Sequence, residues 1–295
     1  MIWTRTMFDG ALRSEPAGPA DPAPSSDGLQ RARGRARLSV TRKDGATRLR
    51  ELYQDGCAKL RCPKTHETAS LEAVLLNTAG GLTGGDRIET DIRADPGSAV
   101  TIATQTCERI YRSLTGDALV KTRVSIADSA NVEWLPQETI LFDGGRVRRR
   151  LHVEMAANAR LLAVEPVVFG RVASGETLGH GLFRDSWRIR RDGELIFADD
   201  TRLDGEIGAI ISRPGLLGGA KAMATVLLAE PDADRFIDPA RSLLDAFPIT
   251  GGVSFVNGAL LSRLAAANSM QLRAGLIPLL TLLRDGRGLP RAWQL

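Results

Sequence analysis

The sequence is poor in the side chains that hold transition metals tightly or form disulfides. Its 295 residues include only three histidines and three cysteines. A small and odd number of cysteines argues against a disulfide framework and is typical of a reducing compartment. The same scarcity argues against a metal store, a metal cluster or a zinc ribbon.

Long apolar segments and a concentrated charge of one sign are lacking as well. The longest apolar run, at 275–283, is far shorter than the roughly 20 residues that cross a bilayer, and the first residues lack the apolar stretch of a signal peptide. Lysine and arginine outnumber aspartate and glutamate by only 39 to 35, and the two signs are interspersed nearly everywhere. A nucleic-acid binder usually gathers its basic residues into a stripe. We therefore expect a cytoplasmic protein that binds neither nucleic acid nor membrane.

The N-terminal region differs in composition from the rest of the chain. Residues 1–34 carry four prolines among alanine, serine, glycine and aspartate. Such a segment cannot bury enough apolar surface to offset the entropy that ordering would cost. We predict a disordered Pro/Ala/Gly-rich tail over 1–34 and a single β-rich domain over 35–295.

Arginine alternates with small residues where this tail ends, at Arg31, Arg33, Arg35 and Arg37. The pattern fits either a nucleic-acid patch or the solvent face of a first strand. Because the alternation continues with apolar residues over 37–40, it favours the strand.

Strand patterns dominate up to about residue 230. Segments such as LVKTRVSI (119–126) and VRRRLHVEM (147–155) alternate polar and apolar residues, as half-buried strands do. The breaks between strands carry turn residues, for example Asp-Pro-Gly at 95–97 and Asp-Gly at 192–193. No helical pattern separates the strands, which disfavours a parallel sheet of β-α-β units and predicts layered, mostly antiparallel sheets.

Two helices are expected in the C-terminal region. Residues 239–247 have helical spacing with Asp238 as the N-cap, and residues 269–283 carry leucines at core-facing intervals, with a kink expected at Pro278. The leucine stripe fits both core packing and a surface that docks a partner.

The segment Asn77–Asp86 (NTAGGLTGGD) is the most distinctive in the chain. Gly80 and Gly85 have the spacing of a phosphate-binding loop, but Asp86 stands where such a loop needs a lysine, and a strand pattern follows instead of a helix. The segment is better explained as a tight turn with positive φ angles, capped by Asn77 and Asp86.

Two cysteine patterns are candidates for chemistry. Cys107 has no local signature of a nucleophile, and the adjacent Glu108 would raise its pKa, so a small buried thiol is the favoured interpretation. Cys57, Cys62 and His66 supply metal-ligand types within ten residues, but at a poor spacing.

Carboxylates form the remaining polar theme. Glu133 stands beside Trp134, and Glu165 lies within the apolar run LLAVEPVVF. A buried carboxylate must be paired, hydrogen-bonded or functional, because an isolated buried charge is very costly. Arg112 and Arg171 are candidate partners, and the sequence leaves a structural ion pair and a functional group as alternatives.

Four of these segments, in this order and spacing, resemble one family. NTAGGLTGGD, TQTCERIYRS, EWLPQETILFDGGR and EPVVFGRVASGE, together with the terminal LPRAW, resemble the urease accessory protein family UreD/UreH. The resemblance covers the chain from about residue 35 to its end. It implies a mainly β fold, a layered, β-helix-like stack of sheets with two α-helices in the C-terminal region.

The resemblance further implies a non-catalytic urease maturation chaperone. Such a protein docks on apo-urease and, with the accessory protein F as direct partner and the accessory GTPase G bound through F, supports nickel delivery, two copies of each forming the accessory complex. Ten positions carry over as motif or structural residues: Asn77, Gly80, Gly81, Gly84, Thr104, Gln105, Arg112, Pro136, Gln137 and Arg171.

A path for a divalent ion needs weak, exchangeable oxygen ligands, so that the ion enters and also leaves. A closed cysteine and histidine site would hold nickel too tightly. We therefore hypothesise that nickel in transit, with no tightly bound cofactor, meets six carboxylates: Asp86, Glu133, Glu138, Asp143, Glu165 and Glu176.

Two other functions remain open at this point. In the first, the protein is a scaffold that only stabilises or opens apo-urease and conducts no metal. In the second, more remote, a pair of carboxylates makes it a hydrolase, although the sequence offers no histidine-based triad and no nucleotide loop.

Overall fold

The computed structural model describes residues 30–64, 69–171, 175–176 and 178–294. Residues Arg31–Leu295 form one compact unit. Most of the predicted tail, residues 1–29, lies outside the described part of the chain. The first strand begins at Arg33, two residues before the predicted start of the domain.

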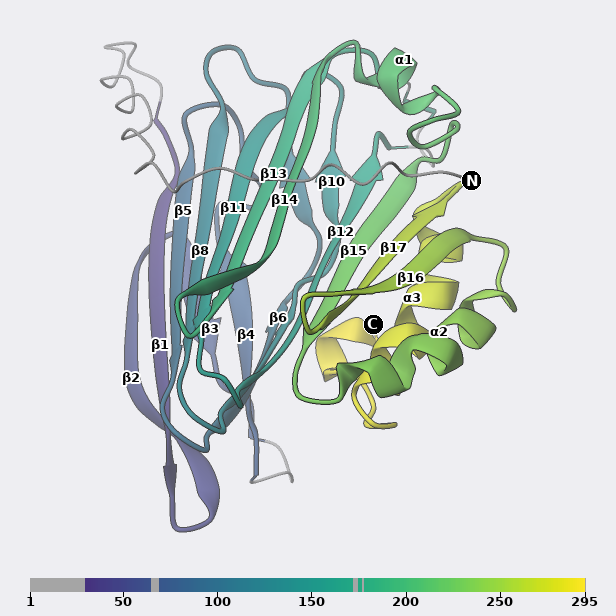
Figure 1. Ribbon diagram of the computed structural model, residues 1–295. Coiled ribbons are helices and arrows are strands. Elements are labelled where there is room, and N and C mark those ends of the chain that lie inside the picture. Colours follow the sequence, from purple (N-terminus) through teal and green to yellow (C-terminus); the bar gives the residue numbers. More distant parts are fainter. Residues whose placement is uncertain (1–29, 65–68, 172–174, 177, 295) are drawn as a thin grey trace, which may run out of the picture. The chain divides into compact units, whose positions relative to one another are not determined.

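Two β-sheets make up most of the unit (Figure 1). Sheet A has seven strands, in the order β14 (Glu194–Gly205), β13 (Gly181–Arg191), β11 (Arg146–Met155), β8 (Ala118–Ile126), β5 (Arg87–Ala94), β1 (Arg33–Lys43) and β2 (Ala46–Gly56). Sheet B has ten strands, eight of them in the order β16 (Thr250–Val256), β17 (Ala259–Ala266), β15 (Ala222–Ala229), β12 (Arg160–Phe169), β9 (Asn131–Leu135), β6 (Ala99–Thr104), β4 (Leu71–Asn77) and β3 (Ala58–Arg61). The other two are short: β10 (Thr139–Leu141) pairs with β12 and with β7 (Glu108–Ile110).

The central strands of both sheets are parallel, so the prediction of mostly antiparallel sheets is wrong. In sheet A, β1, β5, β8, β11 and β13 run parallel, and in sheet B, β4, β6, β9 and β12 do. Antiparallel pairs occur toward the edges, such as β1 with β2 and β13 with β14. The chain passes from sheet A to sheet B and back, so each crossover is a strand of the opposite sheet and no helix is needed. The result is the β-solenoid-like stack that the resemblance implied.

The main core lies between the two sheets. Leu38 of β1 and Val124 of β8 pack against residues of sheet B such as Val132 and Phe169, and all are at most 2% exposed. The alternating arginines of β1 stay at least partly exposed while their neighbours are buried. The interpretation of this arginine run as the solvent face of a first strand is therefore confirmed.

Helices cover the other face of sheet B near β15 and β17 (Figure 1). They are α2 (Ile237–Leu244) and α3 (Ser269–Leu283), with the 3-10 helices η2 (Ala233–Phe236) and η3 (Arg291–Trp293); a short α1 (Ile207–Ile211) follows β14. None of the helices in the described ranges has both the length and the apolar character needed to cross a membrane.

The two predicted helices are present, but the bounds and the N-cap of the first differ from the prediction. The helix α3 has the predicted bounds and contains Pro278, and the Asn268 side chain caps it by accepting a hydrogen bond from the Gln271 amide at 2.9 Å. The helix α2 begins two residues earlier than predicted and ends at Leu244. Asp238 lies inside its first turn, so it is not the N-cap, because the preceding 3-10 helix already sets the chain on a helical path.

The leucine stripe of α3 belongs to a second core. Leu272, Leu276, Leu279, Leu280 and Leu283 are all 0% exposed and pack with α2 and the outer face of sheet B. Of the two interpretations of this stripe, core packing is confirmed.

We expect Leu276→Ala to lower the free energy of unfolding by about 2–5 kcal/mol, because it leaves a cavity between α3 and sheet B. Met270→Ala on the same helix is the control: its side chain is 78% exposed, and a change within about 0.5 kcal/mol is expected. Urea unfolding of both variants measures the difference, and equal effects would contradict this packing.

Candidate functional site

A cavity of about 180 Å³ lies between the two sheets. Sheet A contributes inward-facing residues of β5, β8, β11 and β13, and sheet B contributes residues of β4, β6, β9 and β12 with the short strands β7 and β10. Its wall combines apolar side chains with three acids, Glu108, Glu165 and Asp185. A mainly apolar hollow with a few convergent polar groups is the usual form of a binding site.

Six of the ten motif positions line this cavity. They are Asn77, Gly80, Thr104, Gln105, Pro136 and Gln137, which come from three separate segments of the chain. The remaining four, Gly81, Gly84, Arg112 and Arg171, lie in or next to the connections between strands. The fold therefore gathers most of the motif positions around one internal space.

The glycine-rich segment forms the turn that the sequence predicts. Gly80, Gly81 and Gly85 have φ angles of 76°, 152° and 90°. Asn77 accepts a hydrogen bond from the Ala79 amide at 3.0 Å, and Asp86 accepts one from the Thr83 amide at 2.8 Å. Both capping residues are as predicted, and the Asp86 carboxylate stabilises the turn.

Glu108 is a cavity residue that sequence reasoning did not select. The Asn77 amide group donates to its two carboxylate oxygens, each at 3.2 Å, and the Arg109 backbone amide donates to one of them. Burial outweighs these bonds and raises the pKa of Glu108 to about 7. At neutral pH this carboxyl is therefore divided between its protonated and ionised forms. Its only sequence signal was its place within the motif TQTCERIYRS.

Arg149 joins the other two cavity acids. Its guanidinium donates to Glu165 at 2.6 Å and to Asp185 at 2.7 Å. The Trp134 ring nitrogen also donates to Glu165, at 2.8 Å. Burial, with a further contribution from the nearby Asp185, raises the pKa of Glu165 despite the attraction of Arg149. Glu165 and Asp185 thus share the guanidinium group of Arg149 in the cavity wall.

Of the six carboxylates predicted to meet metal, only Glu165 lines this cavity. Glu138 is 2% exposed and receives bonds from Arg273 at 3.0 and 3.1 Å. It also accepts a hydrogen bond from the Cys107 thiol, at 3.3 Å. Cys107 is partly buried and not fully buried as predicted; this burial, followed by the charge of Glu138, raises its pKa to about 11, so the thiol stays protonated.

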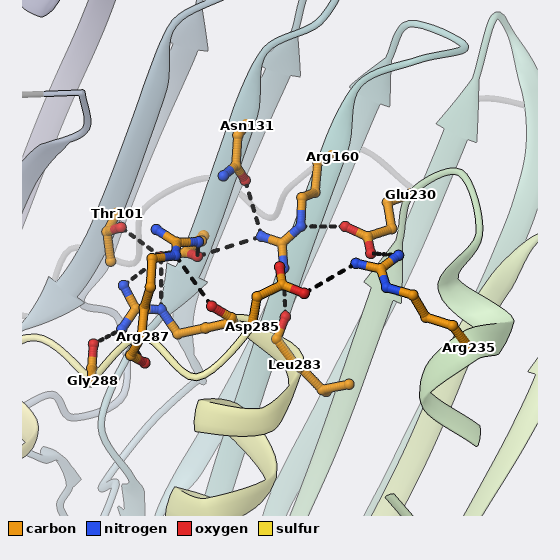
Figure 2. Close-up of polar contacts among 11 residues, drawn as sticks. Thr101, Asn131, Arg160, Glu230, Arg235, Leu283, Asp285, Arg287 and Gly288 are labelled. Carbon is orange, nitrogen blue, oxygen red and sulfur yellow. Dashed lines mark hydrogen bonds and ion pairs between the residues drawn. The ribbon is translucent and has the colours of Figure 1, made fainter. Parts of the chain in front are cut away.

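Glu133 is the centre of a buried arginine network, of which Figure 2 labels Thr101, Arg160 and Arg287. It is 1% exposed and pairs with Arg284 at 2.9 Å, Arg287 at 2.8 Å and Arg160 at 3.4 Å, while Thr101 donates to it at 2.6 Å. Burial alone would raise the pKa of Glu133, but Arg284 above all more than offsets it and lowers that pKa. This carboxylate ties sheet B to the residues that follow α3.

The Glu133–Glu138 segment also holds the C-terminal segment. Gln137 donates to the Ala292 carbonyl at 2.8 Å, and the Trp293 ring nitrogen donates to the Leu135 carbonyl at 2.9 Å. Two segments that carry the family resemblance, EWLPQE and LPRAW, are therefore in direct contact.

Asp143 and Glu176 are held in loops. Asp143 pairs with Arg112 and accepts the Gly179 amide at 2.9 Å, and Glu176 pairs with Arg171 at 3.2 Å. In both carboxyls these bonds outweigh partial burial and lower the pKa. Arg112 and Arg171 are thus the ion-pair partners that the sequence left open, although for loop carboxylates and not for Glu133 or Glu165.

Within the described ranges, no three side chains of histidine, cysteine, aspartate or glutamate are grouped so as to hold a metal ion. Cys57 and Cys62 are free and partly buried, and burial raises the pKa of both thiols. His66, the third residue of this candidate metal cluster, lies outside the described residues.

Comparisons with known proteins point in one direction. A family model described as UreD urease accessory protein matches residues 32–294. The chain is 48% identical over 266 residues to urease accessory protein UreD of Rhizobium johnstonii, a match that covers 90% of this chain and 96% of the relative. It is 46% identical over 273 residues to the protein of the same name from Rhizobium rhizogenes (92% and 99% covered) and 42% identical over 266 residues to that of Agrobacterium fabrum (90% and 92% covered).

Glu133→Ala should lower the free energy of unfolding by about 3–5 kcal/mol, because it leaves buried guanidinium groups without their carboxylate. Asp204→Ala is the matched control: Asp204 pairs with Arg202 at 2.9 Å on an exposed surface, and its loss should cost less than about 1 kcal/mol. Urea unfolding at neutral pH separates the two. A small effect for both variants would contradict a structural role for the network.

Glu108→Gln should change how stability depends on pH. In the wild type, the unfolded carboxyl ionises near its ordinary pKa of 4.5, whereas the folded one ionises at about 7. The free energy of unfolding therefore falls as pH rises from about 4.5 to about 7, because the unfolded state releases its proton at a lower pH than the folded state. Above about pH 7 the carboxyl is ionised in both states, and this contribution no longer changes.

The difference in unfolding free energy between wild type and Glu108→Gln, measured from about pH 4.5 to pH 8, should follow this fall. The exposed Glu194→Gln is the control and should show no such trend. A difference independent of pH would contradict the raised pKa of Glu108.

Proposed function

The chain belongs to the UreD family of urease accessory proteins, which implies a role in urease maturation, and from this premise we propose that the cavity between its sheets passes nickel ions toward apo-urease. The observation that carries the proposal is the convergence of six motif positions on one internal space whose wall bears Glu108, Glu165 and Asp185. Nickel is the cargo here, and the protein itself works without a catalytic centre or a resident cofactor.

The chemistry of the cavity wall suits a transient ligand. Oxygen ligands bind nickel more weakly than imidazole or thiolate, so the ion is released as well as admitted. Glu108, with its pKa near neutrality, can give up a proton as a cation arrives and take one back as the cation leaves. Glu165 and Asp185 share Arg149, which keeps them from closing around the ion as a tight site.

This proposal revises the set of lining residues. Glu108 and Asp185 join Glu165, whereas Asp86, Glu133, Glu138, Asp143 and Glu176 are assigned to holding turns, loops and the C-terminal segment. The partners stay those that the family resemblance implies: accessory protein F bound directly, GTPase G through F, apo-urease, and two copies of each accessory protein. The location stays cytoplasmic, with which the three free cysteines are compatible.

The second candidate function is a scaffold that conducts no metal. It is favoured by the five carboxylates just named, which are held by arginines or backbone amides. In that case the motif residues would maintain a docking-competent fold, and the cavity would be a consequence of packing.

The test reconstitutes maturation with the accessory proteins F and G, apo-urease and nickel. Glu108→Gln removes a titratable cavity oxygen, and Thr122→Leu places apolar bulk at a cavity position without changing charge. We expect both variants to assemble like wild type but to give urease with severalfold less nickel and activity. The exposed Glu194→Gln should behave as wild type in every assay.

Co-purification of the complex and a nickel count on urease are the two readouts. Normal assembly with nickel-poor urease supports passage through the cavity. Loss of assembly in parallel with loss of activation favours the scaffold, and full activation by both cavity variants contradicts the proposal.

A further inference from the structure

Five arginines lie in a single row across sheet A. The strand register pairs Arg33 with Arg87, Arg87 with Leu119, Leu119 with Arg148, Arg148 with Arg184, and Arg184 with Arg202. We call these six positions the arginine row. It takes one residue from each of β1, β5, β8, β11, β13 and β14. At about 4.8 Å between neighbouring strands, it extends over roughly 24 Å.

The row lies on the face of sheet A that points away from sheet B. The chain neighbours of the row, such as Val147 and Phe183, are buried between the sheets, so the alternation turns Arg148 and Arg184 outward. The side chains of Arg148, Arg184 and Arg202 are 35%, 41% and 66% exposed.

The carboxylates next to the row are shared between arginines. Asp117 binds Arg148 at 2.5 Å and also Arg146 at 2.7 Å. Asp200 lies 3.6 Å from Arg184 and binds Arg188 at 2.5 Å. Asp117 and Asp200 each serve two guanidinium groups, whereas Arg202 has its own partner, Asp204, at 2.9 Å. Positive charge therefore remains in excess around Arg148 and Arg184.

Apolar side chains accompany this charge. Leu119 lies within the row, between Arg87 and Arg148, and Leu114, which is 78% exposed, lies in the connection that leads into β8. Ser113 and Thr115 of the same connection lie against Gly84, just before β5 begins. Arginine beside exposed apolar groups is the composition of protein interfaces.

We propose that the arginine row docks an acidic, extended segment of a partner protein. A guanidinium group can form two parallel hydrogen bonds with one carboxylate. The strand spacing places several such groups in a line across the sheet. Glu89 and Asp91 stand on the same face, two and four residues along β5 from Arg87. The exposed apolar side chain of Leu114 beside the row favours a protein segment over a nucleic acid. The proposal is independent of any passage of metal through the cavity.

Labelled poly-L-glutamate is the probe, titrated against the full chain by fluorescence anisotropy. The row variant carries Arg33→Gln, Arg148→Gln and Arg184→Gln, after which Asp117 and Asp200 keep Arg146 and Arg188. The control variant carries Arg48→Gln, Arg213→Gln and Arg291→Gln, exposed positions that remove the same charge elsewhere.

We expect the row variant to bind poly-L-glutamate about tenfold more weakly than wild type and the control to change much less, with the difference shrinking at high salt. Equal weakening of both variants, or no binding by wild type, overturns the proposal. So does tighter, row-dependent binding of duplex DNA, which would assign the face to nucleic acid.

Unfolding curves establish that the variants are folded. If the triple row variant is not, the single Arg33→Glu is compared with Arg48→Glu, since both side chains are exposed and lie at opposite ends of the paired strands β1 and β2. A loss confined to Arg33→Glu supports docking at the row, and equal losses overturn it.

Discussion

The parallel register between successive strands is the constraint on which the rest of the structure depends. Each pass of the chain adds one strand to sheet A and one to sheet B, so residues at one level of the stack become neighbours whatever their distance in sequence. Inward apolar residues thereby stack into a continuous core, which stabilises the sheets without helices between their strands. Inward polar residues are stacked in the same way. Thr90 is paired with Thr122 and Arg149 with Asp185, and the cavity opens where they meet.

The second face of sheet B depends on a buried charge network. Glu133 collects three arginines and a hydroxyl, and these bonds offset the cost of burying its charge. Arg284 is the first residue after α3 and Arg287 lies three residues further on, so the network joins the end of that helix to sheet B. The motif block around Glu133 is therefore as much a structural anchor as a lining of the cavity, which it touches through Trp134, Pro136 and Gln137.

Sequence reasoning succeeded where the signal was local. The glycine turn, the helix over 269–283 and the solvent face of β1 each depend on neighbours in the chain, and each was predicted correctly. It failed where pairing was decided at long range. Parallel strands were disfavoured because no helix separates them, and the sequence did not show that Glu133 and Glu138 pair with arginines of the C-terminal region.

The sequence by itself determined the family, the β-rich composition of the domain and the scarcity of strong metal ligands. Order, spacing and residue type along the chain are sufficient for these. Only the tertiary structure decided which acids line the cavity and which form ion pairs elsewhere. It alone also showed that arginines interspersed with acids along the chain form one row across six strands. The physical reason is register: side-chain neighbours in a sheet are set by backbone pairing between distant strands, and a single sequence does not state that pairing.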